Sequence, residues 1–310
     1  MSDHELLGRI GSGSYGEVWM ARCVLGVLRA VKVVRQSRFE DHQPYEREFA
    51  GVLKLEPLTR AHKGLVDVLH VGRRDAEGYF YYVMELADDA VDGLRQAYPN
   101  PVRLPPTYRA RSLGRELRRR GHLSLAECIQ MGLTLSGALS LLHHHQLVHR
   151  DIKPSNILYV GGVPQLGDPG LGSSAGNTTN LVGTKGYIPP EGCGTPAADV
   201  YSLGKVLYEA STGLSQTQFP LLPSRLMNNG GAEFAEFNEV LLKACAPDSR
   251  QRYASAEALH NDLALLYRGQ SIRQRRHQQR LKRWLQVLAA MGLLAAGVII
   301  GLAWATLRLK

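Results

Sequence analysis

Short apolar runs near the start of the chain predict a small sheet. They are rich in Val, Ile and Leu, and glycines and polar residues separate them, a pattern typical of strands joined by tight turns. The runs cover residues 6–10, 18–21 and 29–34. A helix is predicted next, at residues 44–55, where Glu48, Val52 and Leu55 fall at i, i+4 and i+7 on one face.

The middle of the chain predicts longer helical segments with few strands. Residues 124–142 have the length and apolar content of a buried helix, and residues 163–166 form a short apolar strand. Residues 285–303 carry no charge at all. The pattern thus predicts a strand-rich first part, a helical second part and a separate apolar tail.

The segment HRDIKPSN at residues 149–156 places an acid and an amide at spacings that phosphoryl transfer uses. In the pattern H-R-D-x-x-x-x-N, the Asp takes the proton of the acceptor hydroxyl, and the Asn five residues later ligates Mg²⁺. Asp151 and Asn156 stand at these offsets. The segment therefore predicts a catalytic loop.

A glycine-rich segment at residues 11–16 lies between the first two predicted strands. Its G-x-G-x-x-G spacing also occurs in dinucleotide-binding folds, but there the third glycine opens a helix, whereas a strand is expected here. Glycines lack Cβ, so their backbone N–H groups can approach phosphate oxygens. Lys32 follows in the third strand, where a half-buried ammonium needs a carboxylate partner.

Two acidic residues of the predicted helix compete for Lys32. Glu48 shares the face of Val52 and Leu55, and Glu46 lies about 200° away around the helix. We expect Glu48 to be the partner and keep Glu46 as the alternative, because Gly51 and Pro57 blur the helical register.

Asp168 follows the predicted strand at residues 163–166, in an Asp-Pro-Gly triplet. Such a triplet alone would indicate a turn. In series with the catalytic loop, however, it supplies a second oxygen ligand. Asn156 and Asp168, together with nucleotide oxygens and water, would suffice for Mg²⁺.

With these motifs in this order, residues 5–266 resemble the eukaryotic-like serine/threonine protein kinases that bacteria also use. Three further segments support the resemblance: residues 84–87 as a hinge, 183–191 as the end of an activation segment, and 199–204 as a buried helix. The resemblance implies ATP with Mg²⁺, or alternatively Mn²⁺, and protein substrates. It implies that Asp151, Lys153 and Asn156 are catalytic, that Asn156 and Asp168 bind metal, and that Arg252 pairs with Glu191. The implied nucleotide-binding residues are Ile10, Gly11, Ser12, Gly13, Ser14, Gly16, Val18, Ala30, Lys32, Glu48, Met84, Glu85 and Ala87. Lys153 and Thr184 mark Ser/Thr acceptors.

The expected fold is α+β, with two lobes: an N-terminal sheet with one helix (about 5–84) and a mainly helical C-terminal lobe (about 88–266). One departure is Pro169, where the family usually has a Phe that packs between the lobes. Pro fixes its own φ and biases the residue before it toward extended conformations. Pro169 is therefore expected to restrict the conformational switching of this triplet rather than catalysis. Two rivals remain: a membrane-bound pseudokinase scaffold, and a kinase of small molecules, which residues 184–191 disfavour.

The formal net charge of +9 comes from the end of the chain. Nine Lys or Arg and no Asp or Glu lie beyond residue 262, so residues 1–262 hold 28 of each sign. The predicted catalytic region is therefore neutral, and no nucleic-acid partner is expected.

The tail predicts a single membrane span at residues 284–306, bounded by Trp284 and Trp304. About 20 helical residues cross roughly 30 Å of hydrocarbon, and Trp favours the interfaces. Seven basic residues precede the span and two follow it, which predicts a cytoplasmic kinase domain at the inner or plasma membrane. Residues 267–283 would form a basic linker on anionic lipids, and residues 307–310 a short outer tail with no sensor domain.

Two regulatory expectations follow. Gly297 and Gly301 form a G-x-x-x-G pair that favours a homodimer in the membrane, although chance explains it equally well. Hydroxyls between residues 173 and 179 are expected sites of autophosphorylation in trans, with Arg150 as the cation that pairs with the phosphate.

Overall fold

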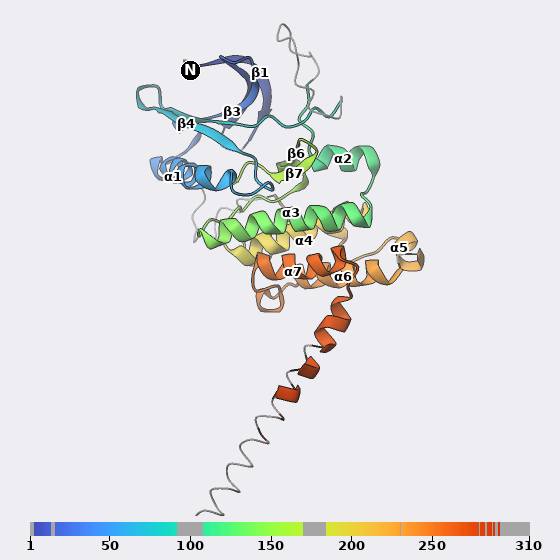
Figure 1. Ribbon diagram of the computed structural model, residues 1–310. Helices are drawn as coiled ribbons and strands as arrows, with labels where there is room; N and C mark the ends of the chain where they lie inside the picture. Colours follow the sequence, from blue (N-terminus) through green and yellow to red (C-terminus); the bar gives the residue numbers. More distant parts are fainter. Residues whose placement is uncertain are drawn as a thin grey trace, which may run out of the picture.

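The computed structural model describes residues 3–13, 16–91, 108–169, 184–229 and 231–278, and a few more up to residue 291. A strand-rich lobe and a helical lobe are stacked on each other, and the last described residues of the chain extend away from the helical lobe (Figure 1). This two-lobed α+β arrangement is the expected one. Ser14 and residues 92–107, 170–183 and 292–310 lie outside the described residues.

The N-terminal lobe is one antiparallel sheet with strand order β1-β2-β3-β5-β4. Helix α1 lies against it, and the apolar core between them includes Val34, Tyr45, Val52 and Phe80. The bounds are β1 His4–Ser12, β2 Gly16–Cys23, β3 Leu28–Arg35, α1 His42–Thr59, β4 Val68–Arg74 and β5 Tyr79–Met84. The three runs predicted as strands are thus confirmed, with longer ends.

The C-terminal lobe is built around α3, which packs against α4 and α7 (Figure 1). A two-stranded hairpin, β6–β7, lies on the side that faces the sheet lobe. The bounds are α2 Leu113–Arg120, α3 Leu125–His144, β6 Ile157–Val160, β7 Val163–Leu166, α4 Pro196–Thr212, α5 Ser224–Asn229, α6 Gly231–Ala244 and α7 Ala256–Tyr267. Short 3₁₀ turns lie at Gln36–Arg38, Asp75–Glu77, Pro154–Asn156, Gln216–Gln218 and Ser249–Gln251.

Local capping signals fix where the two central helices begin. Ser124 and Glu127 form a reciprocal capping box at the start of α3. Thr195 caps α4, whose first residue is Pro196, and Gly213 ends that helix in the left-handed conformation with φ 72°. These caps satisfy backbone groups at the helix ends that have no partner within the helix.

Helix α1 turns Glu48 inward and Glu46 outward. Tyr45, Glu48, Val52, Leu55 and Thr59 form its buried face, and Glu48 is 1% exposed. The helix runs through Pro57 to Thr59, so the register set by its apolar residues continues past the proline.

The chain keeps its contact with the C-terminal lobe beyond α7. Ile272 is 2% exposed and belongs to the main core. Glu236 of α6 accepts hydrogen bonds from the Ser271 hydroxyl at 2.5 Å and from the Ile272 N–H at 2.6 Å. The start of the predicted basic linker is therefore attached to the lobe.

Of the helices that the structure describes, α3 has the length and apolar character to cross a membrane. Half of the relevant segment is buried inside the lobe, as in the core helix of a globular domain. Most of the span predicted at residues 284–306 lies outside the described residues.

Candidate active site

The catalytic loop is held by a buried carboxylate of α4. Asp199, 1% exposed, accepts hydrogen bonds from the backbone N–H groups of His149 at 2.8 Å and Arg150 at 2.9 Å. Arg150 has φ 69°, a left-handed conformation that a side chain disfavours. His143 Nε2 also lies 2.9 Å from Asp199 Oδ2. Asp199 therefore stabilises the strained backbone that presents Asp151.

Asp151 is surrounded by donors from three positions. Asn156 Nδ2 donates to its Oδ2 at 2.8 Å and to its backbone carbonyl at 2.9 Å. Lys153 Nζ lies 2.8 Å from the same Oδ2, and the Thr184 hydroxyl donates to Oδ1 at 3.3 Å. Asp151 is thus an acceptor with one oxygen fixed by Asn156 and Lys153. Its other oxygen faces the segment that carries Thr184.

Lys32 and Asp168 join the two lobes. Lys32 in β3 is 2% exposed, and its ammonium forms an ion pair with Asp168 Oδ1, just beyond β7. The direct partner thus differs from the expected Glu48. A fully buried ammonium needs a contacting anion, and Asp168, with φ 51°, brings its carboxylate to Lys32.

Glu48 acts on Lys32 through its charge. Burial by itself would lower the pKa of the Lys32 ammonium. The charge of Asp168 raises this pKa most strongly, and Tyr82 and Glu48 raise it further. The pKa of Lys32 therefore lies well above its usual range. Lys32 is therefore a permanent cation at the boundary between the lobes. Glu46, the alternative, is instead bound by Arg73.

The glycine-rich segment closes over Asp168. The Gly13 N–H donates to the Gly16 carbonyl at 2.8 Å, which forms a tight turn between β1 and β2. A Cβ on Gly13 would lie 3.0 Å from Asp168 Oδ2, and one on Gly16 would lie 2.4 Å from the Val33 carbonyl oxygen. Gly16 therefore requires glycine, whereas a Cβ at Gly13 would displace the Asp168 carboxylate slightly.

An apolar wall lies between the glycine-rich strands and the predicted hinge. It gathers predicted nucleotide-binding residues from β1, β2, β3 and β5 into one cluster, and residues outside the prediction join it. The predicted members are Ile10, Val18, Ala30 and Met84, and the additional ones include Leu86 and Tyr108. The Tyr108 hydroxyl donates to the Ala87 carbonyl at 3.0 Å, and the Glu85 N–H donates to the Asp67 carbonyl at 3.0 Å. Gly11 and Ser12 lie at the end of β1.

The residues present fit a hard divalent cation. Because Asn156 commits its NH₂ group to Asp151, its amide oxygen is the atom left for a metal. Asp168 adds a carboxylate, and oxygen ligands suit Mg²⁺. Among the described residues, no three His, Cys, Asp or Glu side chains gather to hold a metal ion. A cation at this site would therefore complete its coordination with phosphate and water oxygens.

The end of the activation segment is bound to α4 and to the base of the lobe. Tyr187 donates through its hydroxyl to Glu209, and its carbonyl accepts from the Ser202 hydroxyl at 2.8 Å. Arg252 makes two hydrogen bonds with the Glu191 carboxylate, one of them at 2.9 Å. The predicted Arg252–Glu191 pair is confirmed.

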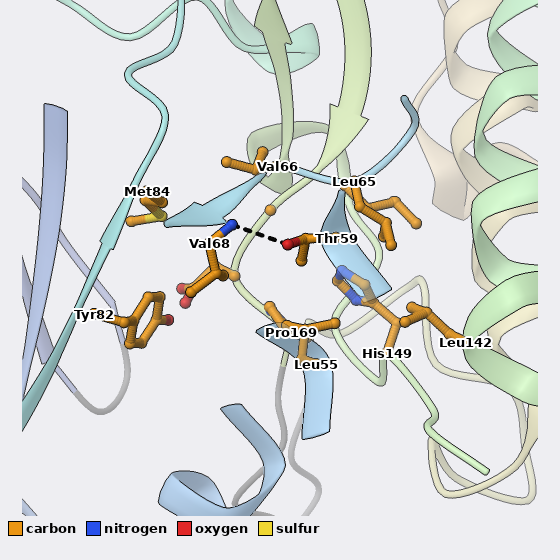
Figure 2. A pocket seen from close by; sticks show the side chains of 13 residues that line it. Leu55, Thr59, Leu65, Val66, Val68, Tyr82, Met84, Leu142, His149 and Pro169 are labelled. Carbon is orange, nitrogen blue, oxygen red and sulfur yellow. Dashed lines mark hydrogen bonds between the residues drawn. The ribbon is translucent and has the colours of Figure 1, made fainter. Parts of the chain in front are cut away.

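Behind Asp168 lies a cavity of about 20 Å³, about the size of one water molecule. Figure 2 shows Leu55, Met84, His149 and Pro169 around it, with the hydrogen bond from the Val68 N–H to the Thr59 hydroxyl at one side. Pro169 therefore lines a cavity between the lobes, at the position where the family usually has a Phe.

Sequence reasoning missed Asp88. This residue is 1% exposed, and its carboxylate accepts hydrogen bonds from the N–H groups of Gly161 and Gly162, each at 2.8 Å. It thereby ties the hinge to the β6–β7 hairpin, whose two ends carry Asn156 and Asp168. Its signal was weak, because an Asp after a hinge is a common surface residue.

Comparison with known proteins agrees with this geometry. Residues 4–224 match the family model described as protein kinase domain. Over 214 residues, 66% of this chain and 17% of the relative, the chain is 35% identical to the serine/threonine-protein kinase PknK of Mycobacterium tuberculosis. It is 28% identical to a probable serine/threonine-protein kinase of Clostridium perfringens, over 84% of this chain and 38% of the relative. It is 25% identical to PrkC of Bacillus subtilis, over 88% of this chain and 42% of that protein.

The chain spans less than half the length of these relatives. The matched region nevertheless contains the catalytic loop, the Lys32–Asp168 pair and the glycine-rich turn. The chain therefore belongs to the protein kinase family, and its kinase domain is of the bacterial serine/threonine type.

Proposed function

We propose that the protein transfers the γ-phosphoryl group of ATP to Ser or Thr hydroxyls of proteins, with Mg²⁺ as the metal and Mn²⁺ as the alternative. The observation that carries this proposal is the meeting of Lys32 from the sheet lobe with Asp168 from the helical lobe, beside the Asp151 cluster. Phosphoryl transfer needs positioned cations and little covalent chemistry from the protein.

Each residue has a distinct task in this mechanism. Asp151 Oδ1, which accepts from Thr184 here, would accept the proton of the substrate hydroxyl instead. Lys153, anchored on Asp151 Oδ2, stabilises the charge on the moving phosphoryl group. Lys32 positions the nucleotide phosphates. When bound, the metal ion neutralises charge between the phosphates, with Asn156 Oδ1 and the Asp168 carboxylate as its protein ligands.

Protein acceptors of the Ser/Thr class are supported by the neighbours of Asp151. Thr184 contacts Asp151, and Tyr187, three residues later, is bound to α4. A platform for a substrate chain therefore begins directly at the catalytic carboxylate. Autophosphorylation at Ser173, Ser174, Thr178 or Thr179 belongs to the same proposal, although these residues lie outside the described ones.

Single-pass tethering, with the kinase domain on the cytoplasmic side, is also a proposal. Apolar side chains at the start of the predicted span have no covering in the described part of the chain: Trp284 is 68% exposed, Leu288 57% and Met291 61%. Their exposure favours insertion of this segment into a bilayer. The basic residues before it would face anionic lipids. Dimerisation through Gly297 and Gly301 falls outside the described residues.

The test is phosphate transfer by the purified protein from labelled ATP with Mg²⁺. We expect phosphoserine or phosphothreonine on the protein itself and on a general acceptor protein. Asp151→Asn should abolish the signal, and Asp248→Asn, which changes a partly exposed carboxylate paired with Arg250, should not. Equal labelling by wild type and Asp151→Asn, or ATP binding without transfer, would favour the pseudokinase reading.

A further inference from the structure

The outer side of α1 carries an ion pair that the catalytic mechanism does not use. The Arg73 guanidinium, from β4, makes two parallel hydrogen bonds with the Glu46 carboxylate, at 2.8 and 2.7 Å. Such a paired contact fixes orientation as well as distance, because the guanidinium is a rigid planar fork. Arg73 Nε also donates a hydrogen bond to the Asp75 carboxylate at 2.5 Å.

The same guanidinium lies over two aromatic rings of α1. Its central carbon is 4.9 Å from the centre of the Phe49 ring and 5.6 Å from that of Tyr45. Tyr45 in turn packs against Phe80 of β5 at 5.3 Å between ring centres. Arg73 thus contacts one carboxylate and two rings of α1 from a strand of the sheet.

The rotation of α1 about its axis decides which acidic residue faces Lys32. Glu46 and Glu48 lie about 200° apart on the helix, so they cannot both point inward. A shift by one residue, about 100°, would carry Glu48 off the buried face. With Glu46 bound by Arg73 outside, the Glu48 carboxylate is 1% exposed and acts on Lys32.

We propose that Arg73 is a positioning residue, which sets the rotation of α1 and so keeps the Glu48 carboxylate beside Lys32. This inference rests on the proposed function, because Lys32 positions phosphates only in a kinase that transfers them. Its energetic contribution as a surface pair is small, since the side chains of Arg73 and Glu46 are 27% and 36% exposed. Its role is geometric.

The test compares Arg73→Ala in two backgrounds of the full chain, wild type and Glu48→Gln, by kcat and KM for ATP. In the wild-type background we expect kcat/KM to fall roughly 10- to 100-fold, the cost of misplacing a positioning group. In the Glu48→Gln background the same change should cost less than about twofold, because the residue through which Arg73 acts is already lost. The control is Arg74→Ala, an exposed neighbour in β4, which should leave both parameters unchanged.

Equal losses in both backgrounds, or no loss in either, would overturn the proposal. Equal losses would mean that Arg73 only supports the fold. Arg73→Lys keeps the charge but not the fork, so an intermediate kcat/KM is expected. Glu46→Gln, which preserves the shape of the helix surface, should lower kcat/KM in the same direction as Arg73→Ala.

A readout without catalysis separates this proposal from the proposed function. If the wild type transfers no phosphate, the proposed function fails, and amide hydrogen exchange in α1 then tests the role of Arg73. We expect faster exchange across α1 in Arg73→Ala than in Arg74→Ala. Identical exchange in the two variants would reject the positioning role.

Discussion

At the scale of single residues, the site depends on how each buried charge is matched. Lys32 has Asp168 as its contacting anion and Glu48 as a nearby one, and Asp151 receives donors from Asn156 and Lys153. The second of these clusters could be predicted from sequence, because its members lie within five residues of one another. The partner of Lys32 could not, because two carboxylates far apart in sequence compete for it and only the packed fold decides.

His149 is expected to make the stability of the folded protein depend on pH. It is 1% exposed, and burial lowers the pKa of its imidazole, an effect that Asp199 opposes. A histidine whose pKa is lower in the folded state binds its proton more readily when unfolded. Its contribution to stability is therefore complete above the unfolded value, about 6.5, and is lost as the pH falls below it.

We therefore expect the unfolding free energy to decrease between pH 7.5 and 5.5, with a slope of at most about 1.4 kcal/mol per pH unit for this one proton. Urea unfolding at several pH values measures this slope. His149→Phe should flatten the curve relative to His277→Phe, a change at an exposed position. His62, whose pKa burial also lowers, leaves a residual slope in both variants. Parallel curves for the two variants would contradict this assignment.

At the scale of elements, local sequence signals predicted which helices and strands exist better than they predicted the contacts between them. The strands at residues 18–21 and 29–34 became β2 and β3, and the helix at 124–142 became α3, because apolar spacing and caps act within a few residues. The contact between Tyr187 and Glu209 was not predicted, since it depends on how α4 approaches the activation segment. Register in α1 was ambiguous for the same reason.

The pair of Arg252 and Glu191 joins the end of the activation segment to the lobe. The Arg252 side chain is fully buried, and it also donates to the carbonyls of Ala246 and Pro247 at 2.7 and 3.0 Å. Arg252→Ala removes the guanidinium, so Glu191 and these two carbonyls lose their hydrogen-bond donor.

Arg252→Ala should lower the unfolding free energy by about 1 to 3 kcal/mol, as expected when several acceptors lose one buried hydrogen-bond donor. Chemical denaturation measures the change. Arg250→Ala, two residues away and paired with Asp248 on the surface, should be indistinguishable from wild type. Similar values for the two variants would show that Arg252 does not hold the segment.

At the scale of the whole molecule, the two lobes meet at the Lys32–Asp168 ion pair. The described part of a basic segment leads away from the helical lobe (Figure 1). The two-lobed fold could be predicted because the motifs occur in one order along the chain. The attachment of Ser271, Ile272 and Arg273 to the acidic residues Glu236 and Glu239 could not, because it joins distant segments.

The proposed membrane tether has a direct test at this scale. The full chain should sediment with membranes and resist alkaline carbonate, because an uncharged segment of this length would insert stably as a helix. Replacing Leu293 and Leu294 with two Asp residues, near the centre of the predicted span, should release it, since each buried charge costs about 3 kcal/mol. Carbonate release of the unaltered chain would count against a span.

The central claim is that Lys32, Asp151, Asn156 and Asp168 surround the triphosphate of a single nucleotide. A crystal structure with Mg²⁺ and a non-hydrolysable ATP analogue measures this directly. We predict an ion at about 2.1 Å from Asn156 Oδ1 and an Asp168 oxygen, with the Lys32 ammonium on the phosphates and Asp151 open to an acceptor hydroxyl. A nucleotide bound away from these four side chains, or bound among them with no metal between Asn156 and Asp168, would contradict the account.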